Sequence, residues 1–200
     1  MKLLLIRHGA TAANERGSYL GKTEEPLSKN GILDIVKKKE SGNYPRAELI
    51  AASPMKRCVQ TAELIYGTAP AVLVEEWKEI DFGSFEGKTW RELKGNSDYQ
   101  KWIDSGGMMP FPDGESREAF IGRCVDGFTR FCGELSGKHP LPETAALIVH
   151  GGTIMAFLSS FSDGDYYSYQ CKCGEGYFCE LDFGKQIRLV RVEKLCCRNI

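Results

Sequence analysis

The chain has 200 residues, of which 42% are hydrophobic and 26% charged, and its net charge is −1. These values are typical of a soluble globular protein, and the length favours a single domain over residues 1–200. The charge balance argues against a protein that coats nucleic acid, because such proteins carry a basic surface. The N-terminal "MKLLLIRHG" turns charged too early for a signal peptide, and no stretch approaches the ~20 apolar residues of a membrane span. We therefore expect a cytoplasmic protein with no membrane contact.

Strands and helices are predicted to alternate along the first half of the chain. The pattern predicts a strand at 2–7, a helix at 28–39, a strand at 47–53, a helix at 53–66 and a strand at 71–76. The first strand is a nearly continuous apolar run, as expected for burial on both faces. Ser53 is expected to cap the helix that follows it, with Pro54 at the first helical position. The third strand is expected to end near Glu75.

The second half continues the alternation and closes with a hairpin. It predicts short helical pieces at 86–104, a Gly/Pro loop at 105–115, a helix at 116–135, a strand at 144–150, a helix from 151 to 160, and paired strands at 176–183 and 186–193. Alternating strands and helices indicate an α/β fold with a mostly parallel sheet covered on both faces. The hairpin is expected to add antiparallel strands at one edge of that sheet.

Polar side chains stand where the predicted strands end. The first strand ends at Arg7 and His8, Arg57 lies one turn into the helix after the second, and the strand at 144–150 ends at His150. Glu79 follows the third strand. In open α/β sheets, ligands bind outside the carboxyl ends of the strands. Because Arg guanidinium groups and helix N-termini suit phosphate oxygens, the sequence predicts a phosphoryl pocket at this rim.

The same residues suggest a mechanism. A neutral His8 imidazole can attack phosphorus, which divides one difficult transfer into two easier steps. Glu79 can protonate the leaving oxygen and later activate water. Gly9, Gly151 and Gly152 are expected to let the backbone come close to the anion.

Each of these residues also has a plainer interpretation. His8 alone is more often structural, Arg57 alone is more often a surface residue, and Asn14 could simply cap a turn. Glu79 could be a solvated loop charge. Three nearby carboxylates compete for its role, and they are Glu75, Glu76 and Asp81.

Cysteines and aromatic residues give two weaker indications. The chain has eight cysteines, and Cys171 and Cys173 with the pair at 196–197 could form a zinc site. That spacing is unlike common zinc motifs and no His lies near it, so we expect reduced thiols and no metal. A second set, Trp102, Met108, Met109 and Phe111, could line a lid, but residues of these types more often belong to the core.

Six segments together resemble the histidine phosphatase superfamily, in its phosphoglycerate mutase-like branch. They are "LIRHGATAAN" (5–14), "YLGKTEEPLSKNG" (19–31), "SPMKRCVQTAE" (53–63), "EIDFGSFEG" (79–87), "PDGES" (112–116) and "IVHGG" (148–152). They follow the family's order and spacing over residues 2–152. The resemblance implies a three-layer α/β/α sandwich and an enzyme that needs no metal or organic cofactor.

The resemblance also implies roles for single residues. His8 matches the phosphorylated nucleophile and Glu79 matches the proton donor. The positions that match phosphate-binding residues are Arg7, Asn14, Arg57, His150 and Gly151.

The substrate is predicted to be a small-molecule phosphate ester. The stretch from Glu79 to Gly83 and the short lid segment at about 95–115 look more like the small phosphatases of the family than the mutases. Within the family the chain is most similar to α-ribazole phosphatases of cobalamin biosynthesis, and Trp102 and Phe111 could stack on a heterocyclic base. A cofactor-dependent phosphoglycerate mutase, a broad-specificity sugar-phosphate phosphatase and a non-catalytic phospho-ligand binder remain as alternatives. Ala10 and Glu24 stand where the family commonly has Glu and Asp.

Overall fold

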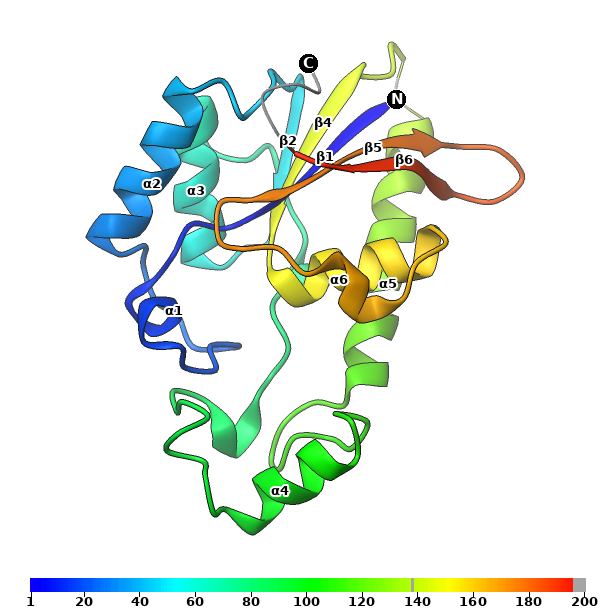
Figure 1. Ribbon diagram of the computed structural model, residues 1–200. Helices are drawn as coiled ribbons and strands as arrows, with labels where there is room; N and C mark the ends of the chain where they lie inside the picture. The colour runs from blue at the N-terminus through cyan, green and yellow to red at the C-terminus, as the bar shows by residue number, and fades with distance from the viewer. Residues whose placement is uncertain (138, 196–200) are drawn as a thin grey trace.

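A computed structural model describes residues 1–137 and 139–195. Its centre is one six-stranded sheet in the order β3-β2-β4-β1-β5-β6 (Figure 1). The strands are β1 (Lys2–Arg7), β2 (Leu49–Ala52), β3 (Val72–Leu73), β4 (Thr144–Val149), β5 (Gly176–Asp182) and β6 (Arg188–Lys194). β1 to β4 pair in parallel, whereas β5 pairs antiparallel with both β1 and β6. The predicted hairpin therefore lies at one edge of a mostly parallel sheet.

Helices cover both faces of the sheet. They are α1 (Ala12–Arg16), α2 (Lys29–Glu40), α3 (Lys56–Tyr66), α4 (Ser97–Asp104), α5 (Arg117–Ser136) and α6 (Gly151–Phe161), with short 3₁₀ turns η1 (Glu75–Trp77), η2 (Gly83–Phe85) and η3 (Tyr166–Tyr169). In Figure 1, α2 and α3 lie on one side of the sheet and α5 and α6 on the other. This arrangement confirms the predicted α/β fold with helices on both faces. No helix in the described ranges is long and apolar enough to cross a membrane.

The sequence of the central strand β1 is apolar because the strand is buried on both faces. Side chains alternate across a strand, so Leu3 and Leu5 pack into the core on the side of α5 and α6. Leu4 and Ile6 pack into the core on the side of α2 and α3. All four are fully buried. Packing on both faces thus holds the strand in place, and this fixes the position of the residues that follow it.

Two predicted element boundaries are wrong, and each has a structural cause. α3 begins at Lys56 rather than at Pro54, because the Ser53 hydroxyl contacts His150 Nε2 at 2.8 Å instead of capping the helix. The Glu24 carboxylate takes over at this end and accepts from the Lys56 amide at 3.0 Å. β3 has only two residues, since the chain turns inward at η1 to bury Trp77 completely.

The expectation that four lid-segment residues belong to the core is half right. Phe111 is buried and Trp102 packs against the core, but Met108 and Met109 are 65% and 47% exposed. The two methionines follow a turn at 106–107 that carries them away from Trp102 and Phe111.

The six cysteines in the described ranges are free, and no set of three or more metal-ligating side chains gathers there. Cys196 and Cys197 of the considered zinc site lie outside the described residues.

Candidate active site

Residues that follow the carboxyl ends of β1 and β4 meet at one edge of the sheet. His8 follows β1 and His150 follows β4, and the two imidazole rings lie 5.1 Å apart in an edge-to-face arrangement. Both are buried, as is Arg57 from the first turn of α3. Because parallel strands end together, the topology alone brings these distant residues into contact.

His8 is held in one tautomer. Its Nδ1 lies 2.7 Å from the carbonyl oxygen of Gly9, which can only accept, so Nδ1 carries the proton. The Nε2 atom then keeps its lone pair. Burial, together with the charges of Arg57 and Arg7, lowers the pKa of His8 well below its ordinary value. The ring is thus neutral and has a nucleophilic nitrogen.

Arg57 is fixed by backbone carbonyls on one side and by His150 on the other. Its two terminal nitrogens donate to the carbonyls of Thr23 and Gly21, at 3.0 and 2.8 Å. Its Nε donates to His150 Nδ1 at 3.3 Å. His150 Nε2 must then carry the proton, which it donates to Ser53. Burial and the Arg57 charge lower the pKa of His150, so this second imidazole is also neutral.

Arg7 reaches the site from the end of β1. Its Nη1 donates to the carbonyl of Cys171 at 2.7 Å, whereas its buried Nε has no hydrogen-bond partner within the described chain. A buried guanidinium N–H without a partner is costly, so a ligand oxygen at this place would satisfy it. Gly151, the first residue of α6, lies beside the guanidinium, where a Cβ would come within 3.3 Å of Arg7 Cζ.

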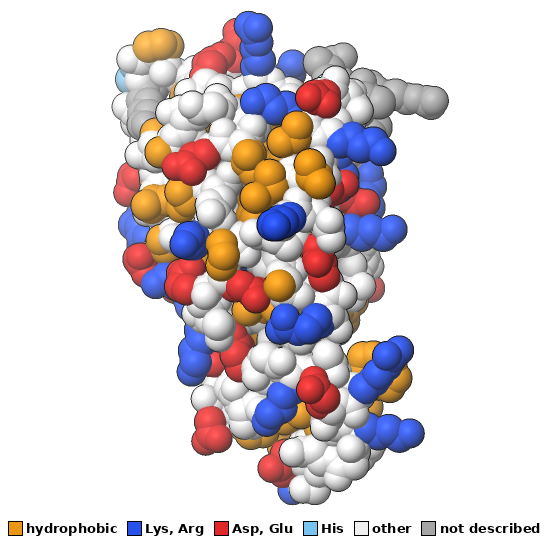
Figure 2. Space-filling view, turned by 90° about the vertical axis from the view of Figure 1, so that its left-hand side faces the viewer, with side chains coloured by type: hydrophobic (Ala, Val, Ile, Leu, Met, Phe, Trp, Pro, Cys, Tyr) orange, Lys and Arg blue, Asp and Glu red, His pale blue; other side chains and the backbone are white. Residues whose placement is uncertain are grey.

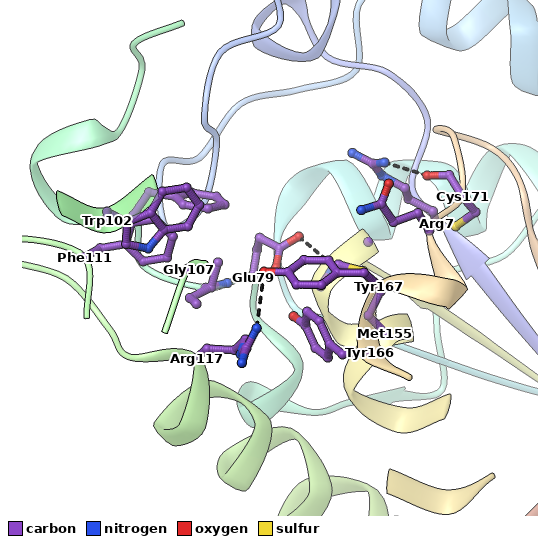
Figure 3. Close-up of a pocket in the computed structure, with 15 residues that line it drawn as sticks. Arg7, Glu79, Trp102, Gly107, Phe111, Arg117, Met155, Tyr166, Tyr167 and Cys171 are labelled. Carbon is purple, nitrogen blue, oxygen red and sulfur yellow. Dashed lines mark hydrogen bonds between the residues drawn. The ribbon is translucent and has the colours of Figure 1, made fainter. Parts of the chain in front are cut away.

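Glu79 stands in the same cavity as Arg7, on the irregular segment between η1 and η2 (Figure 3). Its Oε1 accepts from the Ile80 amide at 3.0 Å, and its Oε2 accepts from the Gly152 amide at 3.3 Å. Burial raises the pKa of Glu79, against the opposing influence of these amides and of Arg57. A carboxyl group with a raised pKa stays protonated up to a higher pH, as a general acid must.

The three competing carboxylates are engaged elsewhere. Glu76 forms a bidentate pair with Arg130 at 2.7 Å, which lowers its pKa. The pKa of Asp81 is also lowered, because burial, which raises it, is outweighed by the hydrogen bonds from Lys22 and the Gly83 amide together with the Lys22 charge. Glu75 pairs with Lys78 at 2.6 Å. Of the four candidates in the sequence, only Glu79 lines the cavity next to Arg7.

Asn14 takes part in the capping box of helix α1, which is close to its plainer interpretation as a residue that caps a turn. Its Oδ1 accepts from the backbone and the hydroxyl of Thr11, at 3.1 and 3.2 Å, and so completes a capping box on α1. Asn14 also lines a second cavity together with Arg7. Because Oδ1 is used in the cap, the amide nitrogen is the atom that remains to face a ligand.

Gly9 and Gly152, two of the three glycines at the rim, have protein side chains beside them where an anion was expected. A Cβ at Gly9 would come 2.9 Å from Ile35, so this glycine allows α2 to pack closely rather than an anion to approach. A Cβ at Gly152 would lie 2.4 Å from Glu79 Oε1 and 3.0 Å from Phe120. Gly152 therefore makes room for the carboxyl group.

This spacing predicts the effect of Gly152→Ala. The added methyl displaces the Glu79 carboxyl, and a misplacement of about 1 Å can cost about 10²-fold in rate. We expect kcat to fall by about that factor. The melting temperature should also fall by a few degrees, because the methyl presses on the buried Phe120. Unchanged kcat for an alkyl phosphate ester would show that the carboxyl does not need its present position.

One wall of the cavity is formed by residues that no sequence motif predicted. The cavity has a volume of about 290 Å³, and besides Arg7, Glu79, Trp102 and Phe111 it is lined by Arg117, Tyr166 and Tyr167 (Figure 3). The guanidinium of Arg117 lies 5.7 Å from the centre of each tyrosine ring and donates to the Tyr167 hydroxyl at 3.4 Å. The tyrosines lie on η3, outside the six motif segments. Only the aromatic run "YYSY" could have drawn attention to them.

The two pKa shifts predict the pH dependence of turnover. A lowered pKa keeps His8 neutral down to pH values below 6.5, and a raised pKa keeps Glu79 protonated above pH 4.5. We expect kcat for an alkyl ester to follow a bell-shaped curve against pH. Its acid limb comes from protonation of His8, at a pH below 6.5, and its alkaline limb comes from deprotonation of Glu79, at a pH above 4.5. Glu79→Gln should remove the alkaline limb. A limb that persists in this variant must come from another group.

Comparison with known proteins places the chain in a family. The pattern of the Histidine phosphatase superfamily (branch 1) matches residues 3–191. Uncharacterized phosphatase PhoE of Bacillus subtilis is 31% identical, over 80% of this chain and 77% of its own length. Adenosylcobalamin/alpha-ribazole phosphatase of Escherichia coli is 30% identical, over 62% of this chain and 63% of its own length. Phosphoserine phosphatases match at similar identity.

A solved structure shares the whole fold. A putative alpha-ribazole-5'-P phosphatase from Escherichia coli superimposes with a TM-score of 0.80, covering 100% of this chain and 98% of that one, at 24% identity. At this identity the likeness concerns the fold. The chain belongs to branch 1 of the histidine phosphatase superfamily, as the motifs indicated. It is a phosphatase of that family and thus a phosphoric monoester hydrolase.

Proposed function

We propose that this chain is a metal-independent phosphomonoesterase that forms a phosphohistidine at His8. The observation that carries the proposal is the state of the His8 ring. Its Nδ1 proton is held by the Gly9 carbonyl, and its neutral form leaves Nε2 free to attack. The six free thiols in the described ranges support a reducing compartment such as the cytoplasm.

In the first step, the His8 Nε2 lone pair forms a bond to phosphorus while the bond from phosphorus to the ester oxygen breaks. The Glu79 carboxyl gives its proton to the departing oxygen. Arg7 and Arg57 neutralise the phosphoryl oxygens, and the Gly151 amide and the Asn14 side-chain amide supply further donors. His150 joins them by exchanging its Ser53 partner for a phosphoryl oxygen.

In the second step, the Glu79 carboxylate takes a proton from water, and the water oxygen attacks phosphorus. The bond from phosphorus to His8 Nε2 breaks and inorganic phosphate leaves. Glu79 is protonated again and His8 is neutral, so the cycle closes without a net change in the protein. Throughout, the Gly9 carbonyl stabilises the imidazolium character of the phosphorylated ring through Nδ1–H.

The proposed substrate is α-ribazole 5′-phosphate, a phosphate ester with a planar heterocycle. The aromatic wall of the cavity supports this choice. Trp102 and Phe111 stack on each other with ring centres 4.9 Å apart, and Tyr99 also stacks on Trp102, so only the parts of these rings that line the cavity can meet a ligand. Tyr166 and Tyr167 add aromatic surface across the cavity. Base stacking on aromatic side chains contributes about 1–3 kcal/mol per base.

The test is a comparison of kcat/KM for α-ribazole 5′-phosphate, O-phosphoserine and p-nitrophenyl phosphate, with EDTA present and His8→Ala as the blank. A value for α-ribazole 5′-phosphate above about 10⁴ M⁻¹s⁻¹, and well above the others, supports the assignment. A higher value for O-phosphoserine rejects the substrate and leaves the chemistry intact. Similar values for all three would indicate a broad-specificity phosphatase. Exchange between 2- and 3-phosphoglycerate would indicate a mutase, and phosphate binding without hydrolysis a non-catalytic binder.

A further inference from the structure

We infer that Arg123, paired with Glu115, is a positioning residue for the catalytic acid. The inference rests on the proposed role of Glu79. That residue lies on the segment 78–82, which belongs to neither a helix nor a strand. The regular hydrogen bonds of secondary structure therefore do not set its position, and something else must hold the backbone.

Arg123 supplies that support from the side of α5. Its Nη1 donates to the carbonyl oxygens of Glu76 and Lys78, each at 2.7 Å. Its Nη2 donates to the carbonyl oxygen of Glu79 at 3.1 Å. One guanidinium thus binds three of the four consecutive carbonyls that lead into the acid. Because these are backbone contacts, they fix the path of the segment and not merely one side chain.

Glu115 orients the guanidinium and attaches the far side of the segment. Its two carboxylate oxygens accept from Arg123 Nε at 2.7 Å and from Nη2 at 2.8 Å, in a bidentate pair. Its own amide donates to the Asp81 carbonyl at 2.9 Å. Arg123 and Glu115 therefore hold the chain on both sides of Glu79.

The pairing of Arg123 with Glu115 also helps the Glu79 carboxyl to stay protonated. An unpaired guanidinium close to Glu79 would favour the carboxylate and work against a general acid. The Glu115 charge offsets that of Arg123, so the arginine can hold the Glu79 carbonyl without adding net positive charge. The Arg123–Glu115 pair therefore serves both the position of the Glu79 backbone and the protonated state of the Glu79 carboxyl.

The test compares Arg123→Gln with Arg130→Gln. Arg130 is a matched control on the same helix, since its exposed guanidinium also contacts residue 76, but through the half-buried Glu76 side chain rather than the backbone. Each variant is assayed on glycerol 3-phosphate, whose leaving group needs a proton, and on p-nitrophenyl phosphate, whose leaving group does not. Arg123→Gln should lower kcat on glycerol 3-phosphate by about 10- to 100-fold and change kcat on p-nitrophenyl phosphate only a few-fold. Arg130→Gln should leave both unchanged.

A double variant separates positioning from general damage. Arg123→Gln should add almost nothing to Glu79→Gln on glycerol 3-phosphate, because the acid is already absent. Equal losses on both esters, or additive losses in the double variant, would overturn the inference. If Glu79→Gln alone shows no dependence on the leaving group, the proposed role of Glu79 fails instead.

Glu115→Gln provides an independent readout should Arg123→Gln melt too low for assay. This change keeps the shape of the pair but leaves the Arg123 charge uncompensated beside the acid. The alkaline limb of kcat should then move to lower pH. A limb that stays in place while the variant remains folded would contradict the charge argument and overturn this part of the inference.

Discussion

His8→Ala should lower turnover of every phosphate ester by at least about 10⁴-fold, because it removes the atom that accepts the phosphoryl group. The fold should survive. His8 is buried, but within the described residues its side chain makes one hydrogen bond, to the adjacent Gly9 carbonyl, and an edge contact with His150. The backbone bonds of His8 to Val149 and Gly174 remain in the variant. The measurement is kcat on p-nitrophenyl phosphate, with the melting temperature recorded on the same preparation.

The matched control for this variant is His150→Gln. Gln keeps a side-chain donor and an acceptor that can serve Ser53 and Arg57, so we expect a smaller loss than in His8→Ala. If the two variants lose activity equally, or if His8→Ala keeps substantial activity, the assignment of His8 as the nucleophile is wrong.

Glu79→Gln should lower kcat by about 10²- to 10⁴-fold on alkyl esters and far less on p-nitrophenyl phosphate. The amide keeps the size of the carboxyl group and can still accept from the Gly152 or the Ile80 amide. It cannot donate an acidic proton to the leaving alkoxide. The ratio of kcat values for the two esters therefore isolates proton transfer from binding and packing.

Two further results complete that test. Glu76→Gln is the matched control, since Glu76 is a nearby carboxylate that pairs with Arg130 outside the cavity. It should leave the ratio unchanged. A Glu79→Gln variant that loses the same factor on both esters would contradict the acid role, because a good leaving group has no need of the proton.

The sheet and the rim of the site could be predicted because their signals are local. The apolar run of β1 and the residues that end it are read directly from neighbouring positions, and the parallel topology then brings His8 and His150 together. The same logic holds for Arg57 in the first turn of α3. Sequence patterns of this kind are strong where a strand is fully buried.

The rest of the site depends on contacts between residues far apart in the chain. Arg7 donates to a carbonyl 164 positions away, and Arg123 holds carbonyls 44 to 47 positions away. On α5 an arginine looks like any polar residue of an amphipathic helix. The N-terminus of α3 differs from the expected position for the same reason, since the Ser53 hydroxyl binds a histidine 97 positions away. Only the three-dimensional arrangement distinguishes such residues from ordinary surface or capping groups.

The most direct test of the proposed mechanism is to trap the phosphoenzyme. A phosphohistidine is stable in alkali and labile in acid, so the enzyme is mixed with p-nitrophenyl phosphate, quenched in alkali and analysed by peptide mass spectrometry. We expect one phosphoryl group on the peptide that contains His8, its loss after brief acid treatment, and no such peptide in His8→Ala. Turnover without a phosphopeptide, or a phosphoryl group on His150 or any other residue, would contradict the mechanism.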